Sequence, residues 1–512
     1  MSKVYKIHPG MGIMRVGPSK LGFFLAAETG ASQAIDIDTG GSDVPFTGYK
    51  DAAMMMRRQG ARFRVYEYDR NDATGALSWV REVTADDATI EWSVKLTASK
   101  AAGKLMGGTT GPDGNDTIVP GQSDRNDPPA GFTRADLAAS VDLSVTGRNA
   151  GPAPGAEPVA RIVGRDLFIG EARTDAAGRL IVLAGRGVAN SWETPLRRTE
   201  NFLNNPTWYD DVADGSVDAI VTLPGASPVS TIGAWVFAAP PDFAPDIYPL
   251  TTLLDIAEQA VNVPLPNPLT YPQDIEPLLK RAGNLYFVSK RNGWGIVKKL
   301  LETSTDLGKN DAGAKPQRSQ LRDAVIASVS QMSRCSLTTR QQAILRSWVD
   351  GAFDEHADAG RSPSPAEDLD RTSLEHCVGG GFLPGIEAGT VLRQATIYSE
   401  FGRITRGTFS DWNGETYQMD PGLISSRMAC PWQADFTECN TNWWPAQRPD
   451  WAGRNTAGQG VEWDRGIIVS GNDASFESHK NMIDHFAQLG VVVRSGNNFI
   501  EIDRDPSLDT GV

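Results

Sequence analysis

A dense group of cysteine and tryptophan residues lies between Cys430 and Trp463. This stretch holds two of the four cysteines and five of the thirteen tryptophans in the 512-residue chain. A thiol and an indole can be joined and oxidised to a protein-derived quinone, which is an electron sink made from side chains. A disulfide between Cys430 and Cys439 is the simpler alternative for the two thiols.

Three segments within this stretch resemble one known family. They read PWQADFTEC at 431–439, WWPAQRPD at 443–450 and WDRG at 463–466. Together they are similar to the cofactor segment of the quinoprotein amino-acid oxidases typified by lysine epsilon-oxidase and glycine oxidase. The enzymes of that family carry cysteine tryptophylquinone, so the resemblance implies this cofactor here.

The resemblance also implies a role for individual residues. Cys439 is the expected sulfur partner, and Asp435, one helical turn earlier, is the acid expected to assist cofactor formation and then to take the substrate proton. Trp463 is the favoured quinone-forming residue, because the family's partner tryptophan lies well beyond the paired tryptophans, and Trp444 is the reserve. The apolar neighbours of Asp435 are expected to raise its pKa, which suits proton abstraction near neutral pH.

Each of these residues also has a plainer interpretation. On that interpretation, Asp435 caps a helix or pairs with Arg448. Cys439 is then an inert buried thiol, and Trp463 is a core aromatic residue. The simple readings would be preferred for any one residue alone. Family-like segments spread from Pro9 to Gly466 favour the cofactor reading when they are taken together.

Four further segments carry the resemblance, at 9–17, 174–185, 208–215 and 379–387. The last is a glycine-rich motif that begins two positions after Cys377, and its glycines either let the backbone approach the cofactor closely or pack tightly for structural reasons. Cys377 either lines the substrate pocket or is a small buried hydrophobe. The segment at 208–215 contains three aspartates, but their spacing is not that of a calcium-binding EF-hand loop. Turn formation and backbone capping are the preferred roles for these aspartates.

The resemblance implies an oxidoreductase that acts on CH–NH2 groups with oxygen as acceptor. Oxidative deamination of an amino acid or primary amine would give an aldehyde or oxo acid, ammonia and hydrogen peroxide. The family also implies a partner, a flavin-dependent maturation protein that oxygenates the tryptophan. One alternative is an oxidase of a peptide- or protein-bound amine, and another is a non-catalytic scaffold or binding protein that kept the fold. The identity of the amine is left open, as is the oligomeric state, a homo-oligomer included.

Composition narrows the function classes. The formal net charge of −14 disfavours a nucleic-acid partner or an anionic membrane surface. The five histidines and four cysteines show no metal-binding spacing, and neither a G-x-S-x-G elbow nor a phosphate loop is present. The N-terminus lacks an apolar signal core and no apolar run has the length of a membrane span, so a cytoplasmic protein is expected, with leaderless export as the alternative.

Hydrophobic periodicity predicts a mixed α+β protein. Alternating apolar residues at 90–96 predict a half-buried strand in a β-rich domain at 1–240. A proline-dense segment at 238–272 marks the boundary to a domain at 241–512, in which helices and short strands carry the cofactor. Helices are predicted around 321–332, 344–349 and 476–489, and a hairpin at 491–502. The segments at 105–130 and 360–368 are expected to be surface loops.

Overall fold

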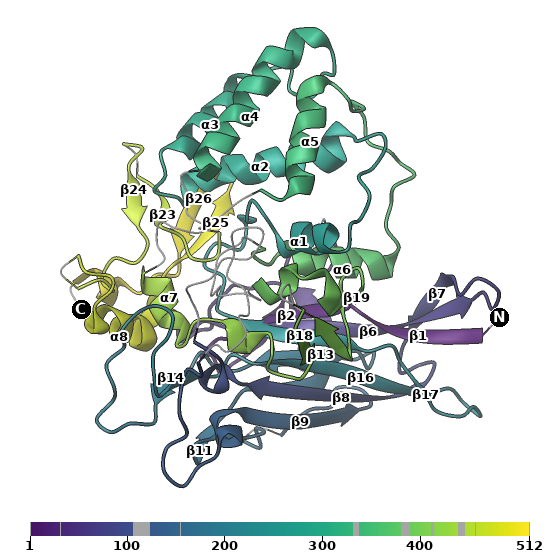
Figure 1. Cartoon of the computed structure of the whole chain (residues 1–512), viewed down its shortest axis with the longest axis vertical. Coiled ribbons are helices and arrows are strands. Elements are labelled where there is room, and N and C mark those ends of the chain that lie inside the picture. The colour runs from purple at the N-terminus through teal and green to yellow at the C-terminus, as the bar shows by residue number, and fades with distance from the viewer. Residues whose placement is uncertain are drawn as a thin grey trace.

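The computed structural model describes residues 2–30, 32–105, 123–153, 155–330, 337–379, 390–410, 414–438, 446–455, 457–469 and 471–510. Over these ranges the N-terminal half consists of strands, and the C-terminal half combines helices with short strands (Figure 1). The predicted α+β class with a β-rich N-terminal half is therefore confirmed. The domain boundary at residue 240 stays a prediction, and the largest apolar cluster takes side chains from both halves, from Tyr5 to Leu508.

A large mixed sheet dominates the N-terminal half. Within the described residues, fourteen strands join it, and its main path runs β5-β4-β3-β6-β2-β18-β16-β8-β9. Strands β1, β7 and β13 pair with the long strand β6, β12 pairs with β13, and β17 pairs with β16. The bounds are β1 Ser2–His8, β2 Met11–Arg15, β3 Phe23–Leu25, β4 Ile35–Ile37, β5 Asp43–Pro45, β6 Arg58–Arg70, β7 Leu77–Val83, β8 Thr89–Ala98, β9 Ala139–Thr146, β12 Gly170–Thr174, β13 Leu180–Ala184, β16 Asp214–Thr222, β17 Val229–Ser230 and β18 Ala234–Ala239.

Two strands show how sequence pattern and burial correspond. In β8 the apolar residues from Ile90 to Leu96 are buried and the polar residues between them are exposed, which confirms the predicted alternation. In β13 all five residues are buried, because alternate side chains pack into two different apolar clusters: Leu180, Val182 and Ala184 lie in one, and Ile181 and Leu183 lie in the other. A continuous apolar run is what a strand covered on both faces requires.

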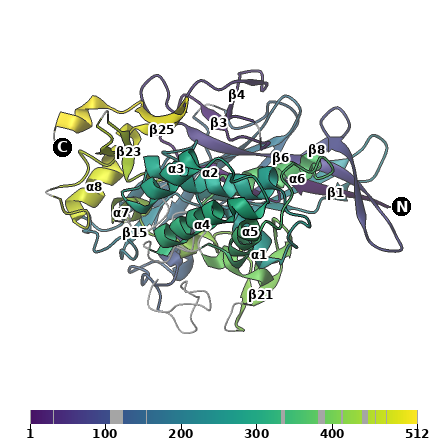
Figure 2. The same ribbon diagram turned by 90° about the horizontal axis from the view of Figure 1, so that it is seen from above.

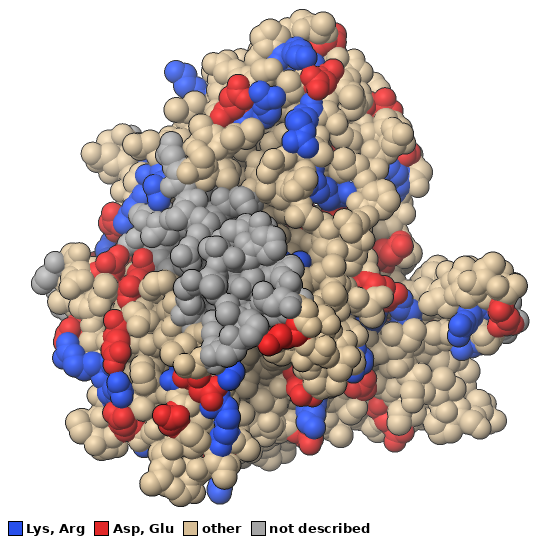
Figure 3. All heavy atoms as spheres, in the orientation of Figure 1, with Lys and Arg blue, Asp and Glu red and all other residues tan. Residues whose placement is uncertain are grey.

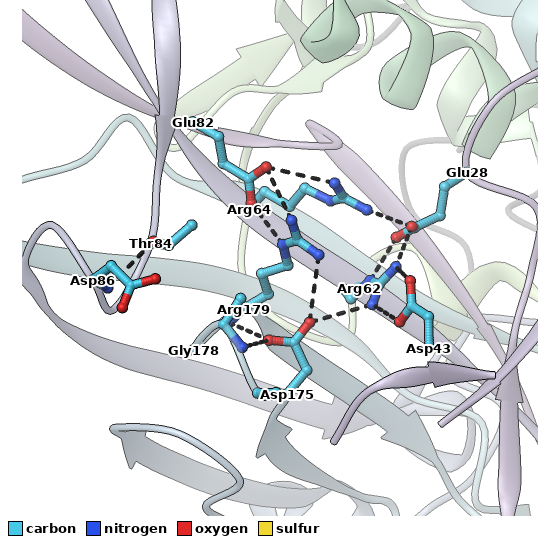
Figure 4. A network of polar contacts seen from close by, with 12 residues as sticks. Glu28, Asp43, Arg62, Arg64, Glu82, Thr84, Asp86, Asp175, Gly178 and Arg179 are labelled. Carbon is cyan, nitrogen blue, oxygen red and sulfur yellow. Dashed lines mark hydrogen bonds and ion pairs between the residues drawn. The ribbon is translucent and has the colours of Figure 1, made fainter. Parts of the chain in front are cut away.

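The turn that leads into β13 is built by Asp175. One carboxylate oxygen of Asp175 accepts the N–H groups of Ala177 and Arg179, both at 2.9 Å, and Gly178 has a φ of +78°. This confirms the predicted Asp/Gly turn. The other oxygen lies 3.2 Å from Arg62 of β6, at the start of a buried ion-pair network that continues to Glu28 (Figure 4).

The helices lie above the sheet (Figures 1 and 2). Helices α4 and α5 confirm the two predicted apolar faces, with Leu321 and Val325 buried in one and Leu345 and Trp348 buried in the other. The loop prediction for 360–368 holds to residue 364 and was wrong beyond it, since α6 begins at Pro365, where Ser364 and Glu367 form a capping box. The bounds are α1 Leu253–Ala260, α2 Glu276–Asn284, α3 Gly293–Thr303, α4 Lys315–Ser330, α5 Thr339–Asp350 and α6 Pro365–Glu375.

The C-terminal elements form a separate group beside the sheet (Figure 1). Helices α7 (Trp432–Glu438) and α8 (Phe476–His485) pack together, near a small sheet of order β24-β23-β26-β25. Its strands are β23 Trp451–Arg454, β24 Gly460–Glu462, β25 Val491–Ser495 and β26 Asn498–Ile502. The last two confirm the predicted hairpin.

Short two-stranded pairs complete the fold: β10 Ala160–Ile162 with β11 Arg165–Leu167, β14 Ala189–Ser191 with β15 Trp208–Asp210, β19 Tyr398–Glu400 with β20 Arg403–Ile404, and β21 Thr408–Ser410 with β22 Thr416–Gln418.

The segment at 105–130 departs from its prediction at one end. Residues 106–122 lie outside the described ranges, but Arg125 and Asn126 are buried. The guanidinium of Arg125 donates to the carbonyls of Lys100 and Met428, so it connects the N-terminal half to the segment before α7. The expectation that this loop buries little was wrong at these two residues, because the polar side chains have backbone partners.

The visible surface carries both signs of charge. Acidic and basic side chains are interspersed over the face drawn in Figure 3. None of the helices in the described ranges combines the length and apolar character needed to cross a bilayer.

Candidate active site

Helix α7 is an almost fully buried helix that carries Asp435. Every residue from Trp432 to Thr437 is buried, and Asp435 has no exposed surface. At the start of the helix, the backbone N–H of Trp432 donates to the carboxylate of Asp210 at 3.2 Å. Asp210 thus satisfies one of the N–H groups that a helix leaves unpaired at its first turn.

Trp463 lies in the same apolar cluster as α7. Its ring centroid is 6.3 Å from that of Phe436 in α7 and 4.8 Å from that of Phe243. The indole N–H donates to the carbonyl of Gly490 at 2.8 Å, and the backbone N–H donates to the carbonyl of Asp450 at 3.1 Å. Trp463 is completely buried, and these two hydrogen bonds hold its backbone and its ring in place.

Arg448 connects α7 to the Trp463 segment. Its guanidinium carbon lies 5.1 Å from the ring centroid of Trp463. The Nε–H donates to the carbonyl of Phe436, and Nη2 pairs with the carboxylate of Asp464, the residue that follows Trp463. A fully buried cation thus faces the indole ring.

A second buried carboxylate, Asp450, lies beside this group. Burial raises its pKa to about 7, while Arg448 and the backbone N–H of Lys290 act in the opposite direction. Lys290 donates that N–H at 2.8 Å, and Arg448 Nη1 is 3.9 Å from the other carboxylate oxygen. Asp450 can therefore hold or release a proton near neutral pH.

The C-terminal end of α7 contacts a buried histidine of α8. His479 Nε2 lies 2.8 Å from a carboxylate oxygen of Glu438, and Nδ1 is 2.7 Å from the hydroxyl of Thr199. Glu438 is the last residue of α7 and immediately precedes Cys439 in the sequence. Thr199 and His479 therefore hold the end of the helix that leads to the predicted cross-link.

Several buried polar atoms around α7 have no hydrogen-bond partner among the described residues. They are Trp432 Nε1, Gln433 Oε1 and Gln447 Oε1. Leaving such an atom unpaired costs about 1–3 kcal/mol, and native proteins carry few of them. Each of these atoms therefore calls for a partner such as a water molecule or a ligand group.

The structure places two of the predicted site residues on or beside α7, and their roles stay predictions. Asp435 belongs to α7, and Trp463 packs against that helix through Phe436. Cys439 and the reserve Trp444 lie outside the described residues. Cys377 is buried, but it packs in a second apolar cluster that does not include Trp463, and its role in the substrate pocket stays a prediction.

The aspartates of 208–215 serve the backbone, as predicted. Asp211 accepts the N–H groups of Arg186 and Val188, and Asp214 accepts the N–H of Ser425. Within the described residues, no group of three or more potential ligands is placed to hold a metal ion.

Gly379 is the one residue of the motif at 379–387 that lies within the described ranges. A Cβ on Gly379 would lie 2.0 Å from the carbonyl oxygen of Thr252, so the close approach there is to backbone at the start of α1. This supports the structural reading of that glycine.

Sequence reasoning missed the central position of Arg448 and the carboxyl group of Asp450. The pattern R-P-D at 448–450 gave no sign that the arginine faces a tryptophan fifteen positions later. Buried charges in an aromatic segment were the available signal, because such charges are rare unless they are paired.

Comparisons with known proteins identify the family to which the chain is similar. The family described as L-Lysine epsilon oxidase N-terminal matches residues 8–238, and the L-lysine epsilon oxidase C-terminal domain matches residues 318–459. A curated relative, L-lysine 6-oxidase from Marinomonas mediterranea, is 26% identical over 85% of this chain and 70% of its own length.

Solved structures of the epsilon-lysine oxidase from Marinomonas mediterranea share the fold. One of them, described as the Schiff base intermediate with L-Lys, has a TM-score of 0.74 at 22% identity and covers 98% of this chain and 95% of its own. Another has a TM-score of 0.73 at 22% identity, with 99% and 95% covered. With both domain families matched in order and the fold shared along the chain, the protein belongs to the L-lysine epsilon oxidase family.

Proposed function

We propose that this protein is a quinoprotein oxidase of amino acids or other primary amines. It is an oxidoreductase of the class that acts on CH–NH2 groups with oxygen as acceptor, as its family membership supports. The reaction is oxidative deamination, which gives an aldehyde or oxo acid, ammonia and hydrogen peroxide. The observation that carries the proposal is the packing of Trp463 against α7, the helix that ends directly before Cys439.

The residues of the site fit a cysteine tryptophylquinone. Trp463 is buried with its ring held by Gly490 and faced by Arg448, and the unpartnered polar atoms of Trp432 and Gln433 provide polar groups in the same region. Cys439 is the proposed sulfur partner. The quinone supplies an electrophile and an electron sink, which unmodified side chains lack.

Formation of this group is a net oxidation. One S–H and three ring C–H bonds are replaced by one C–S and two C=O bonds, and two molecules of dioxygen balance the change by supplying the two oxygens and leaving as two waters. We propose that a flavin-dependent maturation protein carries out this oxygenation. The mass of the chain then rises by about 28 Da.

Asp435 is the proposed base. It is fully buried within α7, among Trp432 and Phe436, and therefore in a region from which bulk water is excluded. A carboxylate in such surroundings can take the proton from the carbon next to the amine. The substrate class proposed is a small free amine or amino acid, in line with the lysine oxidase that this chain resembles.

The test is the intact mass of the protein, purified either from its own host or after co-production with the maturation protein, followed by peptide mapping. A mass excess of about 28 Da in a peptide that joins Cys439 to Trp463 supports the proposal. Hydrogen peroxide release is then measured with a panel of free amino acids, amines and lysine-containing peptides. A modified protein that oxidises only peptides is an oxidase of bound amines, whereas an unmodified protein from its own host is a scaffold.

A further inference from the structure

Arg448 makes a set of contacts that join three parts of the site. Its guanidinium lies 5.1 Å from the ring centroid of Trp463, its Nε–H donates to the carbonyl of Phe436, and its Nη2 pairs with Asp464. Nη1 donates to the carbonyl of Pro449 at 2.8 Å. The guanidinium is therefore held in one orientation by two backbone carbonyls and one carboxylate.

These partners lie next to the proposed reacting residues. Phe436 follows Asp435 and is three positions before Cys439, and Asp464 follows Trp463. A single buried side chain thus bonds to α7 and to the residue that follows the proposed quinone-forming tryptophan. The planar guanidinium is suited to this task, because its donors leave in fixed directions that an ammonium does not reproduce.

Stability alone is a poor explanation for this arrangement. Buried ion pairs frequently stabilise a protein no better than apolar residues of the same volume, because both charges lose their hydration. Arg448 and Asp464 are both buried, so the cost of desolvation applies to each of them. A role in positioning and charge placement explains why a cation is held at the face of an indole.

We infer that Arg448 is a positioning residue, which aligns the ring of Trp463 with α7 for cross-linking and holds a positive charge at the face of the resulting quinone. This inference rests on the proposed function. It makes two separate predictions, one for the completeness of the cross-link and one for the redox potential of the quinone.

The two effects have different physical origins. Cross-linking requires the sulfur and the ring carbon to meet in one geometry, and a misplacement of about 1 Å can cost about 100-fold in rate. The potential depends on charge, because electrons added to the ring are stabilised by a nearby cation in a poorly hydrated site. A lysine at position 448 keeps the positive charge but lacks the several N–H donors of the planar guanidinium. A methionine there lacks both the charge and the donors.

Arg454 offers a matched control. Its guanidinium carbon lies 4.3 Å from the ring centroid of Trp451, and it donates to the carbonyls of Tyr286 and Gly458. Arg454 is the last residue of β23. Like Arg448, it is stacked on a tryptophan and has carbonyl partners, but its tryptophan is not the proposed quinone.

The experiment compares the wild-type protein with Arg448→Lys, Arg448→Met combined with Asp464→Asn, and Arg454→Met, each co-produced with the maturation protein. The double variant removes both members of the Arg448–Asp464 pair, so neither is left buried without the other. Thermal unfolding and circular dichroism establish that each variant is folded. The fraction of cross-linked peptide and the midpoint potential of the quinone are then measured.

We expect Arg454→Met to match the wild type in both readouts. Arg448→Lys should lower the cross-linked fraction, with cross-linking at least about tenfold slower, and leave the potential of the modified fraction near that of the wild type. The double variant should slow cross-linking further and shift the potential of any quinone it forms. A folded Arg448→Lys and a folded double variant with wild-type cross-linking and potential would overturn the inference, while a wild-type protein without any cross-link would overturn the proposed function itself.

Discussion

The ammonium group of Lys100 lies 2.8 Å from the carboxylate of Asp210, and both side chains are almost completely buried. The same carboxylate oxygen accepts the backbone N–H of Trp432, the first residue of α7. Lys100 follows β8 and Asp210 ends β15, so the N-terminal half of the protein anchors the helix that carries the proposed base. The site is therefore held by residues that are more than two hundred positions away from it in the sequence.

Lys100→Met should destabilise the protein strongly, because it leaves the carboxylate of Asp210 buried without its cation. Removal of one partner from a buried pair costs about 3–5 kcal/mol. The free energy of unfolding is measured by denaturant titration. Lys95→Met is the control, since Lys95 and Asp142 form an exposed pair at 3.9 Å that should contribute less than about 1 kcal/mol. Equal stability of the two variants would contradict the anchoring role.

Asp435→Asn should leave a folded protein with little oxidase activity. An amide cannot accept the substrate proton, and loss of a general base typically costs about 100- to 10,000-fold in rate. Steady-state release of hydrogen peroxide measures the effect, and peptide mapping shows whether the cross-link still forms. Asp484→Asn on the exposed side of α8 is the control for a lost carboxylate. Normal turnover by the Asp435 variant would exclude it as the base.

Trp463→Phe and Trp444→Phe distinguish the two candidate tryptophans. If Trp463 forms the quinone, its replacement abolishes the mass excess of about 28 Da, whereas Trp444→Phe retains it. Trp463→Phe also removes the hydrogen bond to Gly490, so the fold of this variant is checked by thermal unfolding. The reverse result would move the assignment to Trp444.

Individual helices and strands could be predicted from the sequence where the apolar residues followed a single periodicity. The apolar spacing in α4 and α5 and the alternation in β8 placed these elements correctly, because each buries a single face against the core. The start of α6 was missed, although Ser364 and Pro365 form a typical helix beginning, because the surrounding glycine and proline residues favoured a loop.

The candidate site could be located but not assembled from the sequence. Resemblance singled out Asp435 and Trp463, and the structure places the first in α7 and the second against Phe436 of the same helix. The approach of Arg448 to the ring of Trp463 depends on how the chain folds back between residues 448 and 463, which no local pattern specifies. The link from Lys100 to α7 spans a still longer separation, so it too required the three-dimensional structure.

Asp211 should make stability depend on pH in a predictable direction. Burial raises its pKa to about 7, against the opposing effect of the backbone N–H groups that it accepts. Between about pH 4 and pH 7 the folded protein keeps a proton on Asp211 that the unfolded chain releases. The contribution of Asp211 to the free energy of unfolding is therefore fully present below about pH 4. It falls by up to about 1.4 kcal/mol per pH unit as the pH rises to 7.

Asp211→Asn removes this dependence, because an amide accepts the same N–H groups without a charge. Relative to the wild type, the variant should thus gain stability between pH 5 and pH 8, as measured by urea titration at each pH. The exposed Asp166 supplies the control, and Asp166→Asn should show no such trend. An Asp211 variant whose stability relative to the wild type is constant from pH 5 to pH 8 would show that this carboxyl group is ionised in the folded protein throughout that range.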